Sequence, residues 1–135
     1  MNTRRFIIAS IIVFIVFEVI NFIIHGLILA GAYEATAELW RADMDQKMWI
    51  IYVGDLVKAF LFVYIFIKGY ENKGWAEGLR YGFWIGLYVS IGMGFGSYAM
   101  YPIPLSMAVQ WFVYGVVQLI ICGIITALIY KPAKS

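Results

Sequence analysis

Four long apolar segments, almost free of charge, constrain the fold of this chain more than any other feature. They cover residues 6–30, 48–67, 79–99 and 105–130. Each has the roughly 20 residues that an α-helix needs to cross a hydrocarbon core about 30 Å thick. Isolated strands are excluded in lipid, because every backbone amide must find its hydrogen-bond partner. The sequence therefore predicts an all-α membrane protein, a four-transmembrane-helix bundle that forms one domain over residues 1–135.

The composition supports a lipid environment. Hydrophobic residues make up 64% of the chain and charged residues only 13%, whereas water-soluble domains carry about 25% charged residues. The net charge is +2, and no patch of basic and aromatic residues indicates a nucleic-acid partner. The single cysteine, Cys122, excludes an intramolecular disulfide and a Cys-based zinc site, so we expect a packed side chain there.

The N-terminal segment imitates a signal peptide, since Arg4 and Arg5 precede an apolar run that ends in Ala30-Gly31-Ala32. A signal peptide has an apolar region of about 7–15 residues. The run here is longer and contains Glu18. We therefore expect a retained first helix.

The distribution of Lys and Arg predicts the orientation. The first loop, residues 31–47, balances its two basic residues with acidic ones, and the turn at 101–104 is uncharged. Cytoplasmic connections carry the excess of Lys and Arg, so both termini and the second loop are expected in the cytoplasm of a multi-pass protein of the cell inner (plasma) membrane. Helix-forming residues at 34–41 predict a short interfacial helix in the first loop. The basic residues behind this orientation are Arg4, Arg5, Lys68, Lys73, Arg80, Lys131 and Lys134.

Two short motifs indicate an internal duplication. Trp49-Ile50-Ile51-Tyr52 opens the second segment, and Trp111-Phe112-Val113-Tyr114 recurs in the fourth. Asp55 and Gln118 follow at similar distances. The interpretation is two related helical hairpins with an axis along the membrane normal; chance similarity between aromatic-rich helices is the alternative.

The third and fourth segments carry residues at intervals of four. Small residues spaced this way form a groove that lets another helix approach closely. Packing inside the bundle is the preferred interpretation, and docking of a partner subunit is the alternative. Gly92, Gly94 and Gly96 also predict a bend. The fourth segment carries a secondary polar stripe that should face the interior. The small residues are Gly78, Gly82, Gly86, Ser90 and Gly94, and the polar stripe is Gln110, Tyr114 and Gln118.

Five polar residues in the first two segments are the strongest functional signal: Glu18, Asn21, His25, Asp55 and Lys58. An isolated charge at the centre of a membrane helix costs about 2.5–3.5 kcal/mol, which predicts pairing. We expect a Glu18–Lys58 pair and a cluster of Asn21, Asp55 and His25. These residues either lock the first hairpin structurally or form a site for a small ligand or for protons.

Cofactor and catalytic patterns are weak. A bis-histidine haem site needs a second histidine beside His25, and no haem is expected. Methionine thioethers with an imidazole are a Cu(I) ligand type, so copper at His25, Met44, Met48 and Met93 remains a weak alternative. No Ser-His-Asp, HExxH or phosphate-binding pattern indicates an enzyme.

Several short motifs resemble a known group of proteins. They are His25-Gly26-Leu27 with Tyr33, Thr36 and Leu39-Trp40-Arg41, then Phe66–Glu71, Gly78–Gly82 and Tyr101-Pro102-Ile103-Pro104. Together they resemble an uncharacterised family of small bacterial four-transmembrane-helix proteins. The resemblance implies the fold and a bacterial inner membrane, but it provides no activity and no catalytic residues.

The sequence thus favours a non-enzymatic membrane protein that binds a small ligand or handles protons in its first hairpin. The alternative is a structural accessory subunit, in a homo-oligomer or a larger membrane complex, that docks through the glycine face of the third segment.

Overall fold

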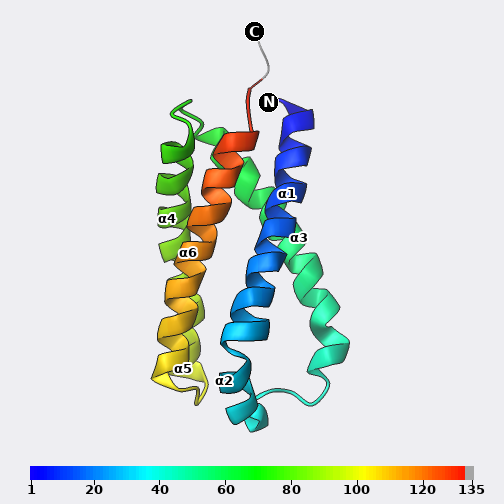
Figure 1. Cartoon of the computed structure of the whole chain (residues 1–135), viewed down its shortest axis with the longest axis vertical. Coiled ribbons are helices and arrows are strands. Elements are labelled where there is room, and N and C mark those ends of the chain that lie inside the picture. The colour runs from blue at the N-terminus through cyan, green and yellow to red at the C-terminus, as the bar shows by residue number, and fades with distance from the viewer. Residues whose placement is uncertain (133–135) are drawn as a thin grey trace.

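The computed structural model describes residues 1–132 as helices and short connections, without a strand (Figure 1). Lys134, one of the residues behind the predicted orientation, lies outside this range. In chain order the elements are α1 (Thr3–Asn21), the π-helix η1 (Phe22–Ile28), α2 (Ala30–Ala35), the 3-10 turn η2 (Ala37–Leu39), α3 (Met44–Lys68), α4 (Trp75–Ile91), the π-helix η3 (Gly92–Gly96), α5 (Ser97–Met100) and α6 (Leu105–Ile129).

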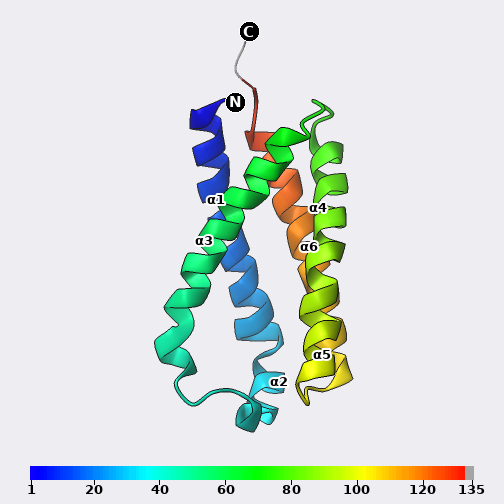
Figure 2. The same cartoon turned by 180° about the vertical axis from the view of Figure 1, so that it is seen from behind.

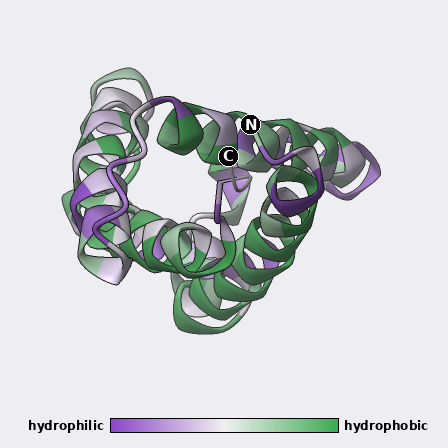
Figure 3. Cartoon of the chain, turned by 90° about the horizontal axis from the view of Figure 1, so that it is seen from above, coloured by the Kyte–Doolittle hydropathy of each residue, from purple (hydrophilic) through white to green (hydrophobic). Residues whose placement is uncertain are grey.

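The predicted membrane character is confirmed at the level of its helices. In the described part of the chain, three helices are long and apolar enough to cross a bilayer: Thr3–Ile28, Met44–Lys68 and Leu105–Ile129. The helical run from α4 to α5 is not one of them, because frequent glycine and tyrosine lower its hydropathy. Viewed from above, the long helices are mainly hydrophobic, whereas hydrophilic residues gather at their ends and connections (Figure 3).

The helices alternate in direction along the long axis of the molecule. The start of α1, the α3–α4 connection and the end of α6 lie at one end, which we call the terminal end; α2 and α5 lie at the opposite end (Figures 1 and 2). At the terminal end, the Asn2 amide donates to the Tyr130 hydroxyl at 3.3 Å, and Arg5 donates to the Ile129 carbonyl at 3.4 Å. The chain therefore begins and leaves its last helix at the same end.

Local sequence signals explain where several helices begin. The Asn2 side chain caps α1 by accepting a hydrogen bond from the Arg5 amide at 3.1 Å, a role that asparagine fills well. Gly74 precedes α4 with φ +68°, a backbone conformation that glycine adopts without a steric penalty. Pro104 precedes α6 in an extended conformation and ends the uncharged turn.

The second hairpin, α4 to α6, is packed backbone against backbone. A Cβ atom on Gly78 or Gly82 would collide with the carbonyl oxygens of Gly123 and Leu119, and one on Gly94 would lie 2.6 Å from the Ala108 carbonyl. All five predicted small residues of this face are buried. The groove predicted from their spacing is therefore filled by α6.

The first hairpin, α1 to α3, is packed over only half of its length. Near the terminal end Ala9 and Val13 contact Ala59 and Val63, and Cys122 joins this core from α6. Toward the opposite end α3 diverges from α1 (Figures 1 and 2). Five consecutive residues there, Trp49–Val53, are each at least 49% exposed. Because five helical residues point in all directions, this half of α3 has no close neighbour within residues 1–132.

Several predicted boundaries needed correction. The first and second helices begin at Thr3 and Met44, earlier than the apolar segments, because a helix continues beyond the part that contacts lipid. The interfacial helix expected at residues 34–41 is instead α2, followed by η2. The irregularity predicted from Gly92, Gly94 and Gly96 coincides with η3.

Candidate functional site

Polar side chains from α1, α3 and α6 meet near the middle of the bundle, with Asn21 at their centre. The Asn21 Nδ2 donates to Asp55 Oδ2 at 3.2 Å. The Gln118 Nε2 donates to Asn21 Oδ1 at 2.8 Å and to the Phe17 carbonyl at 3.1 Å. We call Glu18, Asn21, Asp55, Lys58 and Gln118 the buried network. An amide at its centre both donates and accepts, so it connects the carboxylate of α3 to the amide of α6.

Asp55 is the buried charge of this network, with 2% of its side chain exposed. Its Oδ1 lies 2.5 Å from Lys58 Nζ, whereas we had predicted that Lys58 pairs with Glu18. The reason is local: residues three apart on a helix are neighbours. The Lys58 ammonium also lies 5.7 Å from the centre of the Phe17 ring, although 65% of its side chain is exposed.

Glu18 lies beside this ion pair but has an incomplete set of contacts. Glu18 lies three residues before Asn21 on the same face of α1, and no side-chain hydrogen bond joins it to the other members of the network within residues 1–132. Its Oε1 atom is buried and has no hydrogen-bond partner in the described part of the chain. An unsatisfied buried polar atom costs about 1–3 kcal/mol. Glu18 therefore differs from the other members of the network, because its contacts in the described part of the chain leave a buried oxygen atom unsatisfied.

His25 contacts different residues from those predicted. We expected it beside Asn21 and Asp55, but its Nδ1 hydrogen-bonds the Tyr33 hydroxyl at 2.5 Å. Trp111 Nε1 donates to the same hydroxyl at 2.8 Å, which leaves the Tyr33 hydrogen free to point at Nδ1. Tyr33 and Trp40 meet edge to face at 5.6 Å, and Trp40 lies 6.3 Å from Trp111. We call Tyr33, Trp40 and Trp111 the aromatic cluster.

Other predicted residues are distributed around these two groups. Of the secondary polar stripe, Gln118 enters the buried network, whereas Gln110 and Tyr114 are half-buried elsewhere on α6. Among the copper alternatives, Met44 lines a pocket beside Trp40, and Met93 is 51% exposed on η3. Residues 1–132 contain no group of three or more His, Cys, Asp or Glu side chains arranged to hold a metal ion.

Sequence reasoning missed the aromatic cluster as a partner of His25. Tyr33, Trp40 and Trp111 drew attention only as parts of short sequence motifs, so nothing marked them as contacts of a buried side chain. One signal was present: Trp111 and Gln118 are seven residues apart and share a face of their helix. The same face of α6 therefore contacts both groups.

No protein-family model, curated protein or solved structure matches this chain.

Proposed function

We propose that this chain is a four-span protein of the plasma membrane with both termini in the cytoplasm, and that it binds and releases a proton at Glu18. Two features support the topology. The helical run Trp75–Met100 extends beside α6 through most of the molecule (Figure 2). The terminal end carries Arg4 and Arg5 together with the basic α3–α4 connection, as expected of a cytoplasmic face.

The two hairpins have a similar order of elements, apart from the 3-10 turn η2 in the first, which supports the proposal that they are related by duplication. In each, a long α-helix passes into a π-helix and a short α-helix, and a 25-residue helix returns. Asp55 lies six residues after Trp49 and Gln118 seven residues after Trp111, and both hydrogen-bond Asn21.

The observation that carries the proposed activity is the unsatisfied oxygen of Glu18. Asp55 and Lys58 already balance one another's charge. A second carboxylate beside them would be an uncompensated charge inside the bilayer, which is costly. A protonated Glu18 instead is neutral and can donate a hydrogen bond to Asp55. The network thus stores a proton at Glu18 at small electrostatic cost, and its release leaves Lys58 between two carboxylates.

Among residues 1–132, the polar side chains nearest this site on the side away from the termini are His25 and Tyr33, which we propose as the entrance for the proton. Tyr33 and His25 are hydrogen-bonded, and Asn21 lies one helical turn from His25 on the same face. Imidazole exchanges protons near neutral pH, which suits a relay. Toward the terminal end the core is apolar and contains Val13, Phe62 and Val63. This geometry supports a proton-binding site with a single entrance rather than a conducting channel.

Infrared difference spectroscopy on the protein in lipid tests this proposal. A change of pH on the side of His25 should produce a carboxylic acid C=O signal, and Glu18→Gln should abolish it. Glu38→Gln is the matched control, because Glu38 is an exposed carboxylate of the first loop, and it should leave the signal intact. A signal that survives Glu18→Gln, or one lost only in Asp55→Asn, would contradict the assignment to Glu18. Proton flux across liposomes would contradict the single entrance.

The accessory-subunit alternative is favoured by a different surface from the predicted one. The glycine face of α4 is covered by α6, so a partner docking there would have to displace α6. The half of α3 around Trp49–Val53 is instead exposed on all sides. A photo-crosslinking residue at Ile51 should capture a fixed partner in native membranes if this alternative holds, whereas one at the lipid-facing Val113 should not. Capture at neither position would exclude docking through α3.

A further inference from the structure

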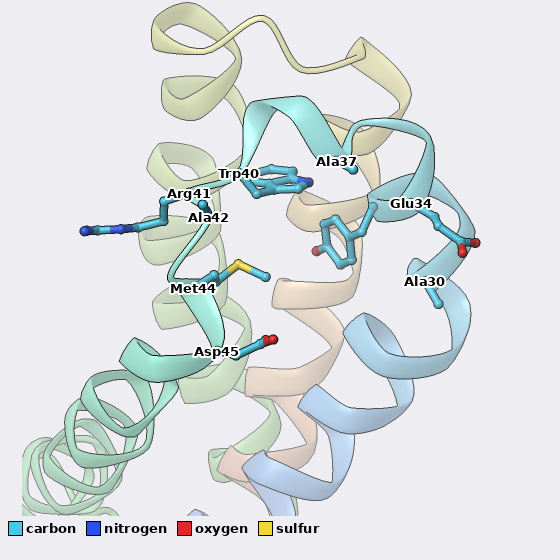
Figure 4. A pocket seen from close by; sticks show the side chains of 9 residues that line it. Ala30, Glu34, Ala37, Trp40, Arg41, Ala42, Met44 and Asp45 are labelled. Carbon is cyan, nitrogen blue, oxygen red and sulfur yellow. The ribbon is translucent and has the colours of Figure 1, made fainter.

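A second candidate site lies outside the buried network, where α2 and the first loop meet the start of α3. Tyr33, Glu34, Trp40, Met44 and Asp45 contribute to a pocket of about 350 Å³. Figure 4 shows the Met44 side chain extending beneath the Trp40 ring, with the Asp45 carboxylate farther from that ring on the other side of Met44. The pocket is open rather than enclosed, so it has room for a small group but does not surround it.

The charges around this pocket leave its mouth negative. Arg41 also borders the pocket, but its Nε and Nη2 contact the two carboxylate oxygens of Asp43 at 2.8 and 3.4 Å, and its side chain points away from Trp40 and Met44 (Figure 4). Lys47 contacts Asp43 too, at 3.5 Å. Both basic residues of the loop therefore converge on one aspartate. Glu34 and Asp45 form no ion pair with any residue from 1 to 132.

The apolar wall of the pocket is aromatic and held in place. Tyr33 and Trp40 pack edge to face at 5.6 Å. The Tyr33 hydroxyl is fixed by both His25 and Trp111. Aromatic faces carry partial negative charge and attract cations, tryptophan most strongly. The soft, polarisable side chain of Met44 adds an adaptable contact.

We propose that this pocket binds an organic ammonium group, which contacts the aromatic rings of Tyr33 and Trp40 and the carboxylate of Asp45. A small inorganic cation is a poorer match, because such ions need several convergent oxygen ligands. An anion is disfavoured because the nearest guanidinium, that of Arg41, is already paired with the Asp43 carboxylate. The ammonium belongs either to a free amine in solution or to a lipid headgroup, since the pocket lies at the end of membrane-length helices.

This site shares Tyr33 with the route to Glu18, but its binding does not require a proton at Glu18. The two proposals can therefore fail separately. Loss of the Glu18 infrared signal without loss of ammonium binding would leave the pocket in place, and the reverse result would leave the proton site in place.

Saturation-transfer NMR on the full chain in phosphatidylglycerol nanodiscs tests the proposal, with choline as the probe. Its uncharged isostere, 3,3-dimethylbutan-1-ol, has the same shape without the positive charge. We expect choline to bind at least about fivefold more tightly than the isostere, as cation–π contact and a carboxylate predict. Repeating the measurement in phosphatidylethanolamine nanodiscs separates the two sources of the ammonium. If choline binds more weakly there, the lipid headgroup competes with it and is the occupant. If choline binding is unchanged, the occupant is a free amine.

Variants localise the binding. Asp45→Asn changes an exposed side chain and should weaken choline binding about fivefold, whereas Glu38→Gln, in the same loop but outside the pocket, should not change it. Trp40→Leu should weaken binding about tenfold, and Trp40→Phe, which keeps an aromatic face, should restore part of it. Equal binding of choline and its isostere, or binding unchanged in both Asp45→Asn and Trp40→Leu, would overturn the proposal.

Discussion

The two hairpins of this protein have a similar order of elements, apart from the 3-10 turn η2 in the first, but opposite kinds of packing. In the second, glycines let the backbones of α4 and α6 touch along most of their length. In the first, α1 and α3 share only an apolar half, and the remainder of α3 is exposed on every side. The polar groups lie where the close packing of the first hairpin ends. The buried network therefore lies mainly on the loosely packed hairpin, and Gln118 of the tightly packed hairpin completes it.

The largest expected difference comes from the same substitution made in each hairpin. Gly82→Ala places a Cβ atom within 2.7 Å of the Ile120 Cα and against the Leu119 carbonyl, so the backbones must separate. We expect a loss of about 2–3 kcal/mol in the free energy of unfolding, as for overpacking elsewhere. Gly54→Ala on α3 meets nothing within 4 Å and should stabilise the helix by up to about 1 kcal/mol.

The measurement is the free energy of unfolding in the same detergent for both variants and the parent. Two alanine variants of equal stability would show that the hairpins are not packed differently, and would remove the basis for the comparison.

The next largest effect concerns the ion pair between the buried Asp55 and the partly exposed Lys58. Asp55→Ala leaves Lys58 and the Asn21 amide without their partner and should cost about 3 kcal/mol. Adding Lys58→Met should recover much of this loss, because the orphaned ammonium is then removed. Unfolding of the two single variants and the double variant forms a double-mutant cycle. If the stability loss of the double variant equals the sum of the losses of the two single variants, Lys58 is stabilised by lipid or water rather than by Asp55.

The sequence was sufficient to predict the helices and which residues interrupt their apolar faces. The interval of four between Gly78, Gly82 and Gly86 also indicated a close contact, because small residues at that spacing expose backbone along one face. The identity of the contacting helix was not predictable from the interval itself. It depends on the complementary positions of α6, where Gly123 and Leu119 present their carbonyl groups.

The partners inside the site were harder to predict, for a geometric reason. Glu18 and Lys58 have similar depths in their helices, but depth does not fix rotation about the helix axis. Lys58 contacts Asp55 on its own helix instead. His25 was assigned to the charged residues by depth as well, but the bend at Leu29 between η1 and α2 lets the Tyr33 hydroxyl reach its ring. Neither the π-helix nor this bend has a reliable signature in the sequence.

A smaller effect is expected in local motion. Regions with few packing contacts open more readily than well-packed ones. The amides of Trp49–Val53 should therefore exchange hydrogen about tenfold faster than those around Gly82 and Gly86, in nanodiscs at constant pH. Equal protection of the two stretches would indicate that a partner or an ordered lipid covers α3, and would favour the accessory-subunit alternative.

The smallest effect lies in the connection between the two hairpins, outside the membrane. Arg80 and Lys73 both contact the Glu71 carboxylate, the former at 2.6 Å, and these contacts lower the pKa of Glu71 from 4.5 to about 2. A lowered carboxyl pKa stabilises the folded state at pH values above the unfolded pKa. This stabilisation is lost as the pH falls from about 4.5 to about 2.

Carboxyl NMR should show this low midpoint directly, and Arg80→Gln should move it back toward 4.5. The connection should keep much of its shape in that variant, because the buried Glu77 carboxylate still accepts hydrogen bonds from the Glu71 and Lys73 amides at 2.6 and 2.9 Å. Since exposed ion pairs contribute little and are screened by salt, the packing of both hairpins should remain unchanged across this pH range. If either hairpin loosens with the Glu71 titration, the connection must take part in holding them together, and the difference between them cannot be attributed to their own interfaces alone.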